Sequence, residues 1–291
     1  MPKKVVSLPA NAMKKVLFIL FLVSFFACKR NDELPLSDVP GRVAMRGDFS
    51  DLQLSIKDGS YSAFTNSTPY RWSHDGSKLS IIDWNASGFY SIVDAATLTE
   101  IVRLNNRDDA GICWSPNDRE VAYIESMDSS IVRFHLQTKQ KQVIHLPPGY
   151  RYLGDIDWSP DGKNFVFIQN HPVYSTSYFL CTIGTDGSNF KVLSEGFLQN
   201  PRWSPDGKTI AFNDNTAIFL INPDGSNKRK LIDDAENPCW STDGSILMYT
   251  LFEDFNWGYK SVIRAREING DQRERLIYDG CGLIDWCPVE E

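Results

Sequence analysis

Short apolar runs separated by clusters of turn residues make up most of the chain from residue 41 onward. Examples are "KLSIIDW", "NFVFIQN" and "TIAFNDN", which are rich in β-branched and aromatic residues and are bounded by Gly, Pro, Asp or Ser. Runs of this kind are typical of β-strands. Beyond the first 27 residues, no stretch repeats its apolar positions with the period of a helix. The pattern therefore predicts an all-β protein.

One phrase, a Trp-Ser pair followed by a turn built from Pro, Asp and Gly, recurs along the chain with small changes. Its tryptophans are Trp72, Trp114, Trp158, Trp203, Trp240 and Trp286, at spacings of 42, 44, 45, 37 and 46 residues. Periods of about 40–45 residues are typical of propeller blades of four strands. The sequence therefore predicts six blades.

Each repeat predicts the same order of strands and turns. The first strand ends at the tryptophan, and the turn places Pro where its fixed φ fits and Gly where φ can be positive. Further strands follow, such as "TIAF", "AIFLI" and "RKLI".

The turn acids resemble those of calcium loops, but such loops need alternating oxygen ligands and a closing bidentate acid. We therefore interpret the acids as turn residues, and the tryptophans as packing between adjacent sheets rather than as sugar platforms.

Five repeats are complete, whereas the sixth supplies only the strand that ends at Trp286. The three missing strands can come from "RVAM", "LQLSI" and "SYSAF", between Arg42 and Phe64. Sharing one blade between both ends of the chain would remove an exposed sheet edge. We therefore expect residues 41–291 to form a single six-bladed β-propeller of four-stranded antiparallel blades.

The first 27 residues differ from the rest of the chain. Lys14 and Lys15 precede an apolar run from Val16 to Phe26, which predicts a secretory signal over residues 1–27. The ending "FFACKRNDE" resembles a bacterial lipoprotein signal, which predicts that Cys28 is lipidated; the alternative is a plain signal cut near Ala27. Residues 1–12 look like an upstream start, and residues 28–40 are expected to form a polar tether.

Charge and cysteine content restrict the class of protein further. The net charge is −7 and moves to −11 when the four lysines of the signal are removed, so the basic surface that binds nucleic acid is missing. Beyond Cys28 there are five cysteines, an odd number without the C-x-x-C spacing of zinc sites. Buried free thiols are expected, with no metal and no cofactor.

The phrase "WSPDGKTIAF…IFLINPDGSNKRKL" resembles the WD40-like repeats of TolB-type six-bladed propellers, and the resemblance covers about residues 66–287. It implies a propeller fold and a place in the cell envelope. TolB proteins are periplasmic, carry an additional N-terminal α/β domain and bind partners of the Tol-Pal system. Here a lipoprotein-like signal precedes the repeats, so the resemblance implies the fold rather than the role.

The residue before each tryptophan forms a series of charges and thiols: Arg71, Cys113, Asp157, Arg202, Cys239 and Asp285. Strand alternation places this series on the face opposite the tryptophans, where we expect it to line the central channel. The order of the blades predicts two ion pairs, Asp157 with Arg202 and Asp285 with Arg71. Two interpretations remain open: the pairs plug the channel, or Arg71 and Arg202 bind a small polar or anionic ligand there.

The loops that join strands two to three and four to one share one face, which we call the loop face. Aromatic residues and arginine, which are enriched at protein interfaces, depart from the repeat there. Packing of some of them as local lids is the alternative. The candidate partner-binding residues are Trp84, Phe89, Tyr150, Arg151, Tyr152, His171, Tyr174, Phe252, Phe255, Trp257 and Tyr259.

Catalytic motifs are missing from this sequence. It has no G-x-S-x-G stretch, and its four histidines are spread over blades one, two and three. We therefore expect a monomeric, non-catalytic, lipid-anchored propeller of the cell envelope that binds a protein or glycan partner. A metal-dependent sugar lyase of the oligogalacturonate lyase type, a propeller whose repeats resemble those of TolB, is the alternative.

Overall fold

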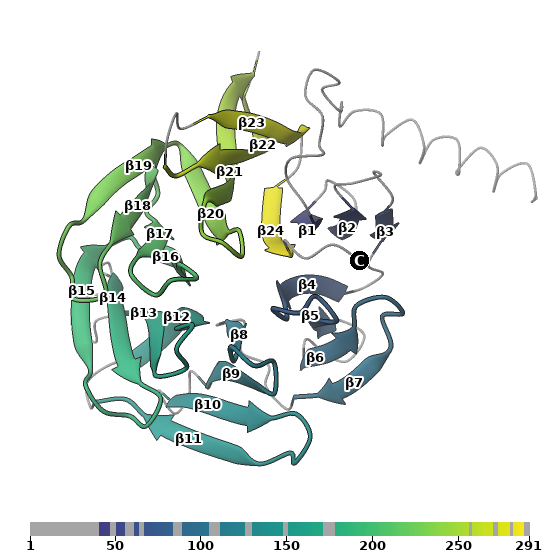
Figure 1. The fold of residues 1–291 in the computed structure, drawn as a ribbon, viewed down its shortest axis with the longest axis vertical. Helices are drawn as coiled ribbons and strands as arrows, with labels where there is room; N and C mark the ends of the chain where they lie inside the picture. The colour runs from purple at the N-terminus through teal and green to yellow at the C-terminus, as the bar shows by residue number, and fades with distance from the viewer. Residues whose placement is uncertain are drawn as a thin grey trace, which may run out of the picture.

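The computed structural model describes residues 41–46, 51–55, 61–63, 67–83, 89–104, 111–125, 130–147, 151–170, 178–255, 258–269, 273–279 and 282–287. In these ranges the strands form six antiparallel sheets of four strands each, arranged around a central axis (Figure 1). The predicted all-β, six-bladed propeller is therefore confirmed. The same ranges contain no helix that is long and apolar enough to span a membrane.

The first three blades follow the chain from the innermost strand outward. Blade 1 is β4 (Ser67–Trp72), β5 (Lys78–Asp83), β6 (Phe89–Asp94) and β7 (Glu100–Arg103). Blade 2 is β8 (Ile112–Trp114), β9 (Glu120–Glu125), β10 (Ser130–His135) and β11 (Lys141–His145). Blade 3 is β12 (Arg151–Trp158), β13 (Asn164–Asn170), β14 (Tyr178–Gly184) and β15 (Lys191–Gly196).

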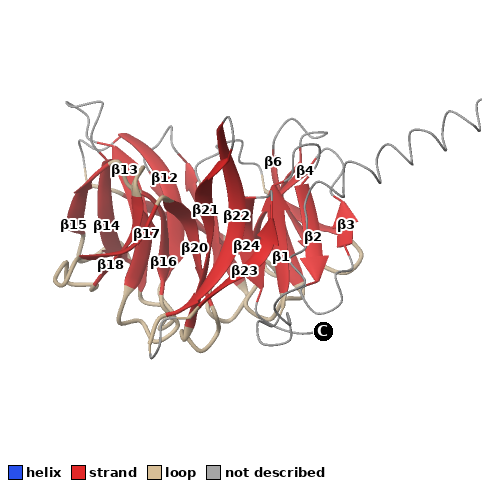
Figure 2. Cartoon of the chain, turned by 90° about the horizontal axis from the view of Figure 1, so that it is seen from above, coloured by secondary structure: helices blue, strands red, loops and turns tan. Residues whose placement is uncertain are grey.

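Blades 4 and 5 continue the same order. Blade 4 is β16 (Gln199–Trp203), β17 (Ile210–Asn213), β18 (Ala217–Ile221) and β19 (Arg229–Asp233). Blade 5 is β20 (Ala235–Trp240), β21 (Ile246–Phe255), β22 (Gly258–Glu267) and β23 (Glu274–Asp279). The ten-residue strands β21 and β22 rise above their neighbours on one side of the disc (Figure 2).

Blade 6 closes the ring with strands from both ends of the described chain. Its order is β24 (Gly282–Cys287), β1 (Arg42–Arg46), β2 (Asp51–Ser55) and β3 (Tyr61–Ala63). Val43 of β1 lies opposite Trp286 of β24 in the antiparallel register. The predicted sharing of one blade is therefore confirmed.

The serine that follows the tryptophan in blades 1 to 5 organises the turn between the first and second strands. In blade 3 the Ser159 hydroxyl donates to Asp161 Oδ1 at 2.6 Å and accepts the Asn164 backbone N–H at 2.9 Å. This hydrogen bond from Ser159 lowers the pKa of the Asp161 carboxyl, and Gly162 closes the turn at a φ of +74°. The same serine contacts recur at Ser73, Ser115, Ser204 and Ser241. The acids therefore serve the turns, as the sequence predicted.

The repeated tryptophans pack between blades, which confirms the interpretation from the sequence. Trp114 packs against Tyr90 of blade 1, and Trp158 packs against Ile124 of blade 2. Trp203, Trp240 and Trp286 occupy the matching clusters between later blades. The guanidinium of Arg42 from blade 6 covers the Trp72 ring at 4.5 Å. Each blade is thereby joined to the one before it.

Blade 3 comes unusually close to the start of β8 in blade 2. A Cβ atom at Gly111 would lie 3.0 Å from Asp155 Cα and 3.1 Å from the Ile156 backbone nitrogen. Blade 1 therefore reaches blade 3 directly, and the Tyr70 hydroxyl donates to Asp155 Oδ1 at 2.9 Å. Gly111 also has a φ of +107°, which L side chains rarely adopt.

Substituting Gly111 by Ala tests this close approach. The variant Gly111→Ala must bear both a strained φ and a contact with the blade 3 backbone, so the free energy of unfolding should fall by about 2–4 kcal/mol. The matched control is Gly162→Ala, where φ is +74° but nothing lies within 4 Å of the new Cβ. That control should lose only about 1 kcal/mol. Equal losses in chemical denaturation would contradict the packing role of Gly111.

Candidate functional site

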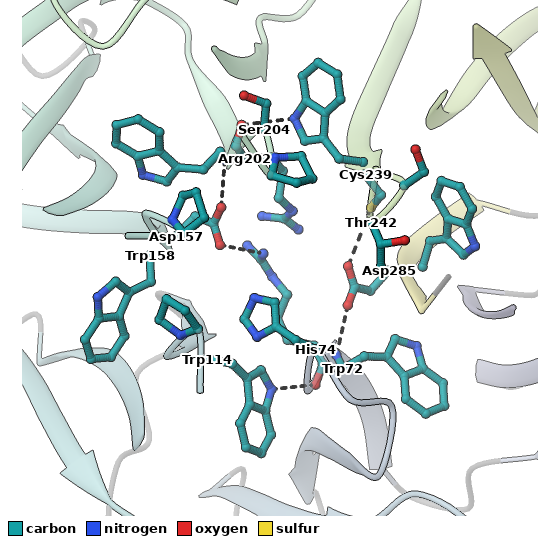
Figure 3. Close-up of a pocket in the computed structure, with 18 of the residues that line it drawn as sticks. Trp72, His74, Trp114, Asp157, Trp158, Arg202, Ser204, Cys239, Thr242 and Asp285 are labelled. Carbon is teal, nitrogen blue, oxygen red and sulfur yellow. Dashed lines mark hydrogen bonds and ion pairs between the residues drawn. The ribbon is translucent and has the colours of Figure 1, made fainter. Parts of the chain in front are cut away.

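A cavity of about 330 Å³ opens at the end of the channel where the turns between first and second strands meet. The turn residues Ser73, Ser204 and Ser241 line it, together with Pro116 and Pro160. This end is opposite the loop face, because first-to-second turns and second-to-third loops lie at opposite ends of a blade. Figure 3 shows the cavity surrounded by indoles, and those labelled Trp72, Trp114 and Trp158 point away from its centre.

The six residues that precede the tryptophans do not behave as a uniform ring. Arg71, Asp157, Arg202, Cys239 and Asp285 line the cavity. Cys113 is instead buried in the core between blades 2 and 3. In each innermost strand, the face opposite the tryptophan is turned toward the next blade. A side chain on that face reaches the channel only if it is long or lies close to the axis.

The predicted ion pairs Asp157–Arg202 and Asp285–Arg71 are wrong. Asp157 and Asp285 do meet the next blade, but the group of that blade that each contacts is a backbone N–H and not the predicted guanidinium. Asp157 Oδ2 accepts from Trp203 at 2.8 Å, and Asp285 Oδ2 accepts from Trp72 at 2.9 Å. The ion pair that forms joins Arg71 Nη1 of blade 1 to Asp157 Oδ1 of blade 3 at 3.4 Å.

The backbone contacts of blades 1 to 3 are repeated in blades 4 to 6. The Trp114 indole N–H donates to the Arg71 carbonyl at 3.1 Å, and the Trp240 indole N–H donates to the Arg202 carbonyl at 3.3 Å. Together with the two aspartates, these contacts give the approximate twofold relation that the order of the repeats predicts. The ring is therefore built from two similar halves.

The two arginines break this relation. Arg71 donates to Asp157 and also, through Nη2, to the Ile156 carbonyl at 3.3 Å. The corresponding partners of Arg202 would be in blade 6, but its Nη1 bonds the adjacent Pro201 carbonyl at 3.2 Å. The Nε atoms of both arginines lack a hydrogen-bond partner among the described residues, so the difference lies in their Nη groups. One cationic group of the cavity is therefore left without a carboxylate.

Burial dominates the protonation of the acidic groups in the cavity. Burial raises the pKa of Asp157 and of Asp285, although Arg71 favours the charged form of both. It also raises the pKa of the Cys239 thiol well above its usual range, and this thiol donates to Asp285 Oδ1 at 3.5 Å. Burial alone would lower the pKa of Arg71, but Asp157 and Asp285 raise it. The charge of Arg71 thus favours the ionised form of both carboxylates, although its ion pair is with Asp157.

His74 contributes to the rim of the cavity and links blades 1 and 2. Its Nδ1 lies 2.9 Å from Asp118 Oδ1, and the same carboxylate accepts the backbone N–H groups of His74 and Asp75. Burial is the largest single effect and works against the charged imidazole, but the hydrogen bond to Asp118 and the charges of Asp118, Asp157 and Asp285 together outweigh it and raise the pKa of His74. Asp118 has the positive φ that glycine has in other blades.

The predicted partner-binding residues are only partly described. Phe252 is 39% exposed near the loop-face end of β21, and Phe89 is partly buried at the start of β6. Arg151, Tyr152, Phe255 and Tyr259 are placed by their backbone alone, in β12, β21 and β22. Trp84, Tyr150, His171, Tyr174 and Trp257 lie outside the described residues, as does Cys28.

The sequence reasoning missed two features. Phe197 is 53% exposed in the link between β15 and β16, on the loop face, and its ring lies beside that of Tyr178. It interrupts the polar link "EGFLQN", which could have identified it. Tyr70 and Asp155 form a second polar contact along the channel, at bulges in β4 and β12 that the regular repeat conceals.

The pKa of His74 is testable by NMR titration of its ring protons. In the wild type it should exceed 6.5, the ordinary value, and in Asp118→Asn it should fall to that value or below. The stabilisation from this contact is present below pH 6.5 and is lost as the pH rises through the folded-state pKa. The His145 signal, at the far end of blade 2, is the internal control. An unchanged His74 titration in Asp118→Asn would contradict the assignment.

Comparison with known proteins yields matches only at the level of three-dimensional structure. No protein-family model matches the sequence. Likewise, no curated protein sequence matches it. The structure is similar to TolB from Acinetobacter baumannii, with a TM-score of 0.65, 16% identity, and 98% of this chain and 75% of that chain covered. It is also similar to a protein described as TolB from Agrobacterium tumefaciens, with a TM-score of 0.63, 17% identity, and coverage of 86% and 94%.

An enzyme is also among the similar structures. Oligogalacturonate lyase from Vibrio parahaemolyticus matches with a TM-score of 0.54 and 17% identity, over 81% of this chain and 73% of that chain. Identities this low establish the fold rather than the activity. The described chain therefore has the fold of a TolB-type six-bladed propeller.

Proposed function

We propose that this chain is a non-catalytic propeller, anchored at the cell envelope through a lipid on Cys28, that binds a protein or glycan partner at its loop face. The TolB-type fold and the lipoprotein-like signal support an envelope location. The anchor holds the domain at the membrane through the tether of residues 28–40, and the propeller acts as a monomer.

The loop face carries the observation on which this proposal depends. Phe197 and Phe252 are both large aromatic side chains that remain exposed, at 53% and 39%. They come from blades that are close in the ring, since Phe197 links blades 3 and 4 and Phe252 belongs to blade 5. Aromatic anchors on a rigid scaffold are the usual centres of binding energy at interfaces. Strands β21 and β22 add a raised edge beside them (Figure 2).

The titratable groups of the turn-side cavity favour binding over catalysis. Asp157 and Asp285 each accept a backbone N–H from the next blade. Cys239 keeps a raised thiol pKa, which disfavours the thiolate that a nucleophile needs. Within the described ranges, no group of three His, Cys, Asp or Glu side chains is arranged to hold a metal ion. The side chains of this cavity therefore act mainly between blades.

Substituting the two exposed phenylalanines tests the loop face. The full chain carrying Phe197→Ser and Phe252→Ser should capture about tenfold less of its partner from detergent-solubilised envelope, because about 1.4 kcal/mol of binding free energy is lost. Capture is measured by quantifying the co-eluting component against the wild type.

The control variant carries Val143→Ser and Val192→Ser, which are both 46% exposed but lie on the outer strands β11 and β15. It should capture the partner as the wild type does. Normal capture by the phenylalanine variant, at unchanged thermal stability, would exclude the loop face as the binding surface.

The lyase alternative has a direct assay. The purified full chain is analysed for metal content and incubated with oligogalacturonate, and absorbance from unsaturated uronides is followed. We expect neither stoichiometric metal nor turnover. Turnover that depends on a bound metal would replace the binding proposal with the lyase.

A further inference from the structure

The cavity on the turn side has the size and the charge of a small-molecule site. Its volume of about 330 Å³ is at the lower end of the range for ligand pockets, about 300–1,000 Å³. A molecule of metabolite size fits such a space, whereas a folded partner does not. The cavity lies on the face opposite the loop face, so this site is independent of the proposed partner surface.

Arg202 supplies an unused charge inside this cavity. Its side chain is directed toward the centre of the cavity (Figure 3), and the residue is only 8% exposed. A guanidinium has five N–H donors. Among the described residues, the only hydrogen bond that the Arg202 guanidinium donates is from Nη1 to the Pro201 carbonyl. A buried cation without a counter-charge is costly. This cost makes Arg202 receptive to an anion.

The comparison with Arg71 shows what is missing at Arg202. Arg71 occupies the equivalent place in the other half of the ring and has Asp157 as its carboxylate. Blade 3 lies close to Gly111 of blade 2 on this side of the ring: a Cβ atom at Gly111 would be 3.0 Å from Asp155 Cα. The equivalent position in blade 5, three residues before the tryptophan, is Asn237, whose side-chain amide donates to Glu236 of the same strand at 3.3 Å. Among the described residues, Arg202 therefore has no carboxylate partner equivalent to the Asp157 of Arg71.

The charge of the ligand follows from the other groups in the cavity. Asp157 is already paired with Arg71, and Asp285 is held by the Trp72 N–H and the Cys239 thiol. The formal charges of the two arginines and two aspartates balance, but the hydrogen-bond donors of Arg202 have no carboxylate among the described residues. The two nearby carboxyl groups would repel a dianion such as phosphate more strongly than a monoanion. A planar carboxylate also matches the guanidinium with two parallel hydrogen bonds.

The remaining wall determines the rest of the ligand. Three proline rings, Pro116, Pro160 and Pro205, line the cavity, together with parts of the repeated tryptophans. These groups offer apolar contact and no charge. We propose that the turn-side cavity binds a small monocarboxylate with an apolar body, whose carboxylate is held by Arg202.

Calorimetric titration of the full chain in mild detergent tests the proposal with benzoate as the probe. Benzoate should bind at least tenfold more tightly than benzamide, its neutral analogue, and than inorganic phosphate. Equal binding of benzamide or phosphate, or no binding of benzoate, would overturn the proposal. The Phe197→Ser, Phe252→Ser variant should bind benzoate normally, so the outcome is separate from that of the loop-face proposal.

Three variants assign the binding to Arg202. Arg202→Gln should weaken benzoate binding at least tenfold, whereas Arg229→Gln, exposed on β19 of the same blade, should not change it. Asp285→Asn keeps the acceptor for the Trp72 N–H and removes a negative charge, so it should tighten binding by about threefold or more. Unchanged affinity in a folded Arg202→Gln protein would overturn the assignment. If that variant does not fold, unchanged or weaker binding by Asp285→Asn would do so instead.

Discussion

The contact between the innermost strand of one blade and the tryptophan of the next is the interaction on which this ring depends. A sheet of four strands cannot bury both of its faces alone, and each blade does so by packing against its neighbours. The indoles fill that space, and near the axis Asp157 and Asp285 bind the backbone N–H groups of Trp203 and Trp72. Closure by β24 and β1 then leaves no blade with an uncovered face.

The same contacts explain why the channel is not symmetric. Two halves of three blades repeat each other in their backbone hydrogen bonds. The first half has Gly111, where a Cβ atom would meet the backbone of blade 3, and the second half has Asn237 at the same place in the repeat. Arg71 reaches across a blade to Asp157, whereas Arg202 bonds the adjacent Pro201 carbonyl and forms no ion pair among the described residues. The different contacts of the two arginines thus distinguish the one used for structure from the one whose donors face the cavity.

The two ends of the channel consequently have different chemistry. The turn side has a small cavity that is lined by charged groups and proline rings. The loop side presents exposed aromatic residues on links and strand ends, beside the long strands β21 and β22. Propellers of one fold support many functions because these ends vary while the blades stay constant. The role of this chain must therefore be argued from these two surfaces and not from the fold.

The sequence by itself determined the number of blades, the order of strands and the shared sixth blade, because turn chemistry and strand alternation act over a few residues. It also determined which side of the first strands the tryptophans occupy. Only the tertiary structure decided that Asp157 pairs with Arg71, that Cys113 is buried away from the cavity and that His74 meets Asp118. These outcomes depend on the spacing between blades and on the reach of long side chains, which no single repeat contains.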